Sequence, residues 1–72
     1  MKPLLEKVKS SNLDSIGHEE DILYIRFIDG GLYSYQPFTA STFKKFQKAP
    51  SKGKFFHKYI RNNKDYKVTK IE

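Results

Sequence analysis

Residues 22–36 read ILYIRFIDGGLYSYQ, and this stretch decides the fold of the chain. Residues 22–28 are rich in β-branched and aromatic side chains, as strands are. The Asp29-Gly30-Gly31 segment is a strong turn signal, and the alternating residues LYSY follow it. The pattern therefore predicts a β-hairpin over about residues 22–36.

The length of the hairpin loop decides which way Tyr33 and Tyr35 point. The two share one face of their strand because strand side chains alternate with a period of two. A two-residue loop would place them beside Tyr24 and Arg26. Those four side chains would then form an aromatic and cationic platform on the sheet, which suits stacked bases and phosphates.

A three-residue loop, a type I turn with a glycine bulge, has the opposite effect. It would turn Tyr33 and Tyr35 toward the apolar row of the first hairpin strand, Leu23, Ile25 and Phe27. Both loops suit Asp-Gly-Gly, so both arrangements remain open at this point. We favour packing of the two rings under helices, with their hydroxyls at the rim, because so small a protein usually buries such rings.

The residues after the hairpin predict two short helices, over about 40–48 and 52–61. Thr39 and Ser51 suit their N-caps, and Ala49-Pro50 separates them. A short strand is expected at residues 13–16, and another near the C-terminus, around 66–68. We therefore predict a single α+β domain over residues 1–72, a small antiparallel β-meander followed by two short helices and a short C-terminal strand.

The composition fits a small cytoplasmic protein. Seventy-two residues are near the lower limit for one core, and the absence of cysteine rules out disulfide support. Five tyrosines and six phenylalanines are therefore expected to supply much of that core. No apolar run approaches the roughly 20 residues of a membrane span, and the opening apolar stretch is too short for a signal peptide.

The net charge of +6 is distributed unevenly. Residues 37–72 carry nine lysines and one arginine against two acids, a net +8, whereas residues 1–36 sum to −2. This asymmetry favours an anionic partner, although a lysine-rich surface that keeps the protein soluble explains it equally well. The candidate nucleic-acid or anion-binding residues are Lys44, Lys48, Lys52, Lys54, Lys58 and Arg61. The candidate stacking residues are Tyr24, Arg26, Tyr33 and Tyr35.

Catalytic and metal sites have little support in the sequence. His18 and His57 are too few, without cysteine, for a structural zinc site, which needs about four nitrogen or sulfur ligands. Ser41 and Ser51 lack a nucleophile-elbow context, and capping explains both. The Ser51-Lys52-Gly53-Lys54 stretch is a weak anion-site candidate at a helix start, or a helix entry in which glycine allows close packing. We expect a non-enzymatic domain without metal or cofactor.

The order and spacing of several motifs resemble the KTSC domain family, over roughly residues 8–66. That family has a serine-rich opening, a Gly-Tyr-Asp type turn, an alternating apolar strand, a central Tyr-x-Tyr, a Val-Pro helix entry, and a Ser-x-Gly-x-Tyr-Phe-Asn segment leading to Ile-Arg. The matching segments here are Ser10-Ser11-Asn12, Gly17-His18, residues 23–27, Gly30, Tyr33-Ser34-Tyr35, residues 51–57 and Ile60-Arg61. The departures are His18 and Phe55 for tyrosine, His57 for asparagine, and a displaced Pro37.

The resemblance implies RNA binding, because the domain occurs at the C-terminus of some lysyl-tRNA synthetases as well as alone in bacteria and phages. We therefore expect the basic helical half to bind RNA or another nucleic acid. Two alternatives stay open: a protein-binding adaptor or phage-encoded inhibitor that docks an acidic host protein, and a binder of a small phosphorylated nucleotide-type ligand. No membrane partner is expected, and the oligomeric state is open.

Overall fold

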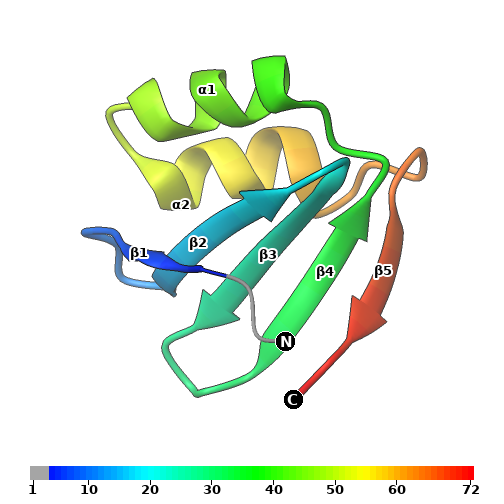
Figure 1. Ribbon diagram of the computed structural model, residues 1–72. Helices are drawn as coiled ribbons and strands as arrows, with labels where there is room; N and C mark the ends of the chain where they lie inside the picture. Colours follow the sequence, from blue (N-terminus) through cyan, green and yellow to red (C-terminus); the bar gives the residue numbers. More distant parts are fainter. Residues whose placement is uncertain (1–3) are drawn as a thin grey trace.

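The computed structural model describes residues 4–72 as an antiparallel sheet with helical segments on one face (Figure 1). The sheet has five strands in chain order, β1 (Glu6–Lys7), β2 (Leu13–Glu19), β3 (Ile22–Phe27), β4 (Leu32–Gln36) and β5 (Lys67–Lys70). Between β4 and β5 come α1 (Ala40–Lys48), α2 (Lys52–Phe55) and the π-helical turn η1 (Phe56–Ile60), which continues α2. This confirms the predicted α+β order, the hairpin and the C-terminal strand.

The β3–β4 loop has the three-residue form. The Gly30 N–H donates to the Phe27 carbonyl oxygen (2.9 Å), and the Phe27 N–H donates to the Gly31 carbonyl oxygen (2.8 Å). Gly30 has a φ of 100°, in the left-handed region that glycine adopts without steric cost. This geometry is a turn followed by a glycine bulge, one of the two loops that Asp-Gly-Gly permits.

The loop places both tyrosines of β4 on the side of the sheet that faces the helices. Leu23 pairs with Tyr35, and Ile25 pairs with Tyr33, across the two strands. Directly paired residues point to the same face, so the rings lie beside the apolar row of β3. This confirms the favoured packing of the two rings toward the helices, and the alternative prediction, a two-residue loop, is wrong.

A β-bulge brings Leu13 and Ile16 to the same face of β2. Leu13 pairs with Phe27 but Ser15 pairs with Arg26, so one extra residue of β2 is accommodated between these pairs. In a regular strand, residues three apart would point to opposite faces. The bulge buries both Leu13 and Ile16 completely. The strand predicted over residues 13–16 is longer in the structure and ends at Glu19. The short edge strand β1 was not predicted.

The core lies between the sheet and the helices. Both predicted caps are present, since Thr39 Oγ1 accepts the Thr42 N–H and Ser51 Oγ accepts the Lys54 N–H. The predicted second helix ends in a π-turn, in which the Arg61 N–H donates to the Phe56 carbonyl oxygen. The core side chains are Leu13, Ile16, Leu23, Ile25, Tyr35, Phe38, Phe46, Phe56 and Ile60.

The opposite face of the sheet is also covered. Leu32 is 1% exposed there, and the Ile71 N–H donates to the Leu32 carbonyl oxygen (2.7 Å), which ties the C-terminal residues to β4. A Cβ atom at Gly17 would collide with the Leu4 carbonyl oxygen and lie 2.9 Å from Leu5 Cδ2. Gly17 therefore allows residues 4–5 to cross this face. Among the helices of residues 4–72, none is long and apolar enough to cross a membrane.

Replacing Gly30 tests whether its backbone conformation holds the loop. Nothing lies within 4 Å of a Cβ atom built at Gly30, so the cost of Gly30→Ala is conformational. We expect Gly30→Ala to lower the free energy of unfolding by about 1 to 2 kcal/mol in urea denaturation. Gly30→Asn should cost less, because asparagine tolerates left-handed backbone. Equal stability of all three proteins would contradict the role assigned to Gly30.

Candidate functional site

An open cleft of about 670 Å³ separates the β3–β4 turn from the second helical segment. We call it the hairpin cleft. It draws on β3 and its turn, β4, β5, the loop before β2, and α2–η1. Its lining residues are Ser11, Asn12, Phe27, Ile28, Asp29, Tyr33, Tyr35, Gly53, Phe56, His57, Arg61 and Val68.

Two tyrosine rings form the floor of the hairpin cleft. Tyr35 is 5% exposed, and its ring meets Phe56 edge-on, with centroids 5.8 Å apart. Tyr33 is half-buried, and its ring meets Phe27 edge-on at 5.4 Å. Within the described part of the chain, neither hydroxyl has a hydrogen-bond partner. No buried side-chain oxygen of these residues lacks a partner, so both hydroxyls reach the solvent, where they are free to bond a ligand.

Burial also changes the acidity of two tyrosines. It raises the pKa of Tyr35 to about 12, and the nearby Tyr33 adds to the effect. Burial likewise raises the pKa of Tyr66, with a further contribution from Asp65. The Tyr35 phenol is therefore neutral at physiological pH and acts there as a hydrogen-bond donor or acceptor, not as a charge.

His57 and Arg61 stand together on the rim of the cleft. Arg61 Nη1 lies 3.2 Å from His57 Nδ1. A guanidinium group only donates, so the imidazole accepts at Nδ1 and carries its hydrogen on Nε2. The pair lies one helical turn apart, and both side chains are exposed. The rim therefore offers a fixed positive charge beside a second N–H donor.

A second depression of about 550 Å³ adjoins the first. We call it the lysine hollow because Lys54 and Lys58 line it. The other residues in its lining are Ser10, Ser11, Asn12, Ser51, Gly53 and His57. Ser11, Asn12, Gly53 and His57 line both depressions. Together the two depressions form one groove, which we call the basic groove.

Local hydrogen bonding fixes one wall of the basic groove. Ser10 Oγ accepts the backbone N–H groups of Asn12 (3.1 Å) and Leu13 (3.2 Å), which shapes the loop before β2. A Cβ atom at Gly53 would lie 3.1 Å from this oxygen. Because Ser10 is held by two donors, glycine is what allows α2 to approach the loop. This confirms the prediction that glycine at this helix entry allows close packing.

The six cations proposed from the sequence occupy different places. Lys54 and Lys58 line the lysine hollow, and Arg61 lines the hairpin cleft. Lys52 donates to the Ala49 carbonyl oxygen (2.8 Å) at the end of α1. The remaining two, Lys44 and Lys48, are exposed on α1 and line neither depression. The rim of the groove therefore brings together half of the proposed set.

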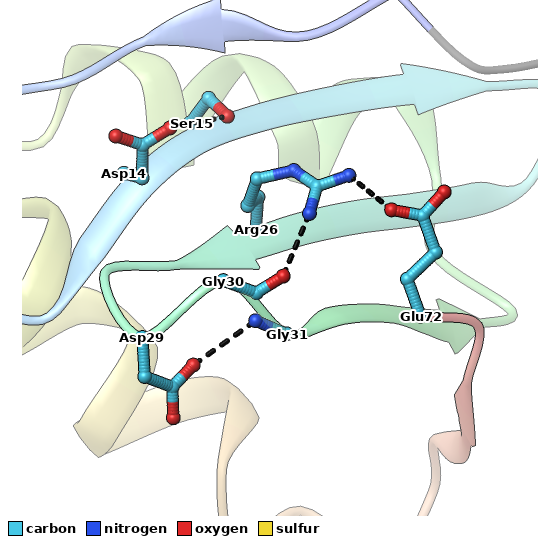
Figure 2. Close-up of polar contacts among 7 residues, drawn as sticks. All are labelled: Asp14, Ser15, Arg26, Asp29, Gly30, Gly31 and Glu72. Carbon is cyan, nitrogen blue, oxygen red and sulfur yellow. Dashed lines mark hydrogen bonds and ion pairs between the residues drawn. The ribbon is translucent and has the colours of Figure 1, made fainter.

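The four-residue stacking platform does not form. Arg26 pairs with Leu32 and Tyr24 with Ser34, so Arg26 and Tyr24 lie on the face opposite the other two tyrosines. Arg26 donates to the Gly30 carbonyl oxygen (2.7 Å) and to Glu72 Oε1 (2.6 Å), as Figure 2 shows. The guanidinium group is thus engaged in holding the turn and the C-terminus. The separation follows from the three-residue loop.

His18 has a structural position. Its Nε2 hydrogen bonds to the Phe38 carbonyl oxygen, and its ring stacks on Phe43 with centroids 5.1 Å apart. The strand end of β2 is thereby joined to the start of the helical half. Over residues 4–72, no group of three or more metal-ligating side chains comes together.

Several groove residues were not proposed from the sequence. Asn12, Ile28, Asp29 and Val68 line the hairpin cleft but come from three separate parts of the chain. The one local signal in the sequence was an apolar residue, Ile28, directly before the turn. In the structure 58% of this side chain is exposed. The others meet only through the fold.

The architecture defines a class: a small α+β module, with a five-stranded meander and a groove between its hairpin and its second helix. Comparison with known proteins gives the family. The KTSC domain model matches residues 9–66, and the chain belongs to the KTSC domain family. A crystal structure of a KTSC domain protein from Yersinia pestis is similar, with a TM-score of 0.88 and 32% identity, over 99% of this chain and 100% of that one. A search of curated proteins finds no match.

Several of the segments that carry the family resemblance converge on the basic groove. Residues 10–12, Tyr33, Tyr35 and Arg61 line it, as do five of the residues in 51–57. These segments are far apart in the sequence. Their convergence gives the motif a single place in the fold, with Tyr35 contributing to the core and the cleft at once.

The raised pKa of Tyr35 predicts a specific loss of stability at high pH. The phenol ordinarily titrates near 10 and does so near 12 in the folded protein. The neutral form is therefore favoured by folding, and its contribution is complete below pH 10 and is lost as pH rises toward 12. In urea unfolding between pH 9 and pH 11.5, the wild type should lose up to roughly 2 kcal/mol more than Tyr35→Phe. Lysine deprotonation cancels in this comparison, so identical slopes would refute the desolvation of this phenol.

Proposed function

We propose that the domain binds single-stranded nucleic acid, with RNA favoured, along the basic groove, and that it is not an enzyme. The observation that carries the proposal is the arrangement of Lys54, Lys58 and Arg61 along a groove with Tyr33 and Tyr35 on its floor. Cations that follow the backbone and rings that contact the bases are the two elements of single-strand binding. The association of the family with lysyl-tRNA synthetases supports RNA.

The extent of the positive charge favours a polymer over a small ligand. A phosphorylated nucleotide would fit the hairpin cleft alone, beside Arg61. Lys54 and Lys58 lie beyond that cleft, in the adjoining hollow, where they suit the next phosphates of a chain. Lys44 and Lys48 extend the same basic half on α1, which packs beside α2 (Figure 1). An acidic protein partner would account for the lysines but not for the two tyrosine rings that line the same groove.

Charge reversal on the groove rim tests the proposal. We expect the affinity for a fluorescein-labelled single-stranded RNA hexamer to fall with salt, with a log–log slope of about −0.7 for each phosphate contact, or about −2 for three. Lys54→Glu combined with Lys58→Glu removes two contacts, so the slope should become shallower by about 1.4. The measurement is fluorescence anisotropy across a salt titration.

A matched variant separates local contacts from net charge. Lys45→Glu with Lys67→Glu makes the same charge change at exposed residues that line neither depression, and it should leave the slope nearly unchanged. Lys44→Glu with Lys48→Glu measures the contribution of α1. An affinity that is flat across salt would refute the proposal. So would a melting temperature that rises with free nucleotides but not with the hexamer, since that result indicates the small-ligand alternative.

A further inference from the structure

The hairpin cleft has chemically different ends. At the helical end stand the Arg61 guanidinium group and His57. At the turn end stands Asp29, whose Oδ1 accepts the Gly31 N–H at 3.0 Å (Figure 2). Among the residues that the structure describes, no donor is paired with the second carboxylate oxygen, Oδ2. A ligand is therefore offered a cation and an N–H donor at one end and a free acceptor at the other.

The wall between these ends is apolar and unusually exposed. Ile28 is 58% exposed and Val68 is 49% exposed, and both line the cleft. The Phe27 and Phe56 rings also line the cleft and meet edge-on, with centroids 5.4 Å apart. An exposed apolar patch rimmed by polar groups marks a binding site more often than a plain surface.

The positively charged end, the apolar wall and the free carboxylate oxygen together match the chemistry of a nucleotide. A phosphate is attracted by Arg61 and repelled by Asp29, so it belongs at the helical end. The base then lies along the apolar wall and presents its polar edge to the turn. Amino groups of bases donate to carboxylates, as cytosine N4 does to aspartate and glutamate. Uracil has no amino group, and two carbonyl oxygens flank its one N–H.

We infer that the hairpin cleft accepts one unstacked base that carries an exocyclic amino group, from a strand bound along the basic groove. The inference rests on the proposed function and adds to it the discrimination between bases. A base within a duplex turns its polar edge to its partner, so the cleft selects single strands or extruded bases. Asn12 and the hydroxyls of Tyr33 and Tyr35 supply further polar contacts at the floor.

Filling the cleft tests whether a base enters it. Val68 and Thr69 are neighbours on β5 that point to opposite faces, because Val68 pairs with Tyr35 and Thr69 with Ser34. Val68→Trp places an indole at the wall of the cleft, and Thr69→Trp adds the same group on the other face. We expect Val68→Trp to weaken binding of a cytidine hexamer about tenfold, the loss of one stacked base, and Thr69→Trp to change it less than twofold.

Each outcome of that comparison has a distinct meaning. Anisotropy titrations at fixed salt give the affinities, and thermal melting by circular dichroism establishes that both variants fold. If Val68→Trp binds as tightly as Thr69→Trp with the wild-type salt slope, the base cleft is refuted while nucleic-acid binding stands. If the wild type binds no oligonucleotide at all, the proposed function itself fails, and the cleft inference fails with it.

Asp29→Asn tests the discrimination between bases. Asparagine keeps an oxygen for the Gly31 N–H and replaces the free carboxylate oxygen with an amide donor, which suits a uracil carbonyl group. The wild type should bind the cytidine hexamer about fivefold more tightly than the uridine hexamer, and Asp29→Asn should abolish or reverse this preference. Loss of a negative charge strengthens binding to both oligonucleotides, but it cancels in their ratio. An unchanged ratio would overturn the role of Asp29.

Discussion

The left-handed backbone of Gly30 is the constraint on which the rest of the structure depends. It sets the three-residue loop, the loop sets the register of β3 against β4, and the register turns Tyr33 and Tyr35 toward the helices. A slip of one residue would turn both rings to the other face, away from the helices. The same register sends Arg26 to that other face, where it binds Gly30 and Glu72. The position of the candidate site is therefore decided in the turn.

Coverage of both sheet faces explains why the groove lies at an edge of the core. One face carries the helices, and the other carries residues near both termini, as the contacts of Gly17 and Leu32 show. In so short a chain this double burial adds apolar contact on both sides of a sheet. Neither flat face is then open to a ligand. What remains is the hairpin cleft between the turn and α2, where Arg61 joins Tyr33 and Tyr35 in one lining.

Local signals predicted much of the fold, and non-local pairing accounts for the rest. Thr39 and Ser51 correctly predicted where the two helices begin, because capping depends only on residues within one turn. The sequence left the register of β3 against β4 undecided because Asp-Gly-Gly fits two loops, of which the structure has the three-residue form. The bulge between Leu13 and Ser15 escaped prediction because it requires the partner strand. The candidate site was the least predictable part: its lysines appear in the composition, but only the fold places Asp29 in the cleft that adjoins the hollow they line.

Tyr35 links stability and recognition because it belongs to both the core and the cleft. Its ring is held by Phe56, so the cleft floor is as rigid as the core itself. A rigid floor costs little entropy on binding, whereas the lysines at the rim must be ordered by the ligand. Under the proposed function the two parts contribute differently: the rim cations supply attraction that any strand can use, and the floor and the turn supply contacts that depend on the base. That proposal assigns discrimination to the side chains nearest the hairpin, and affinity to those of the helix.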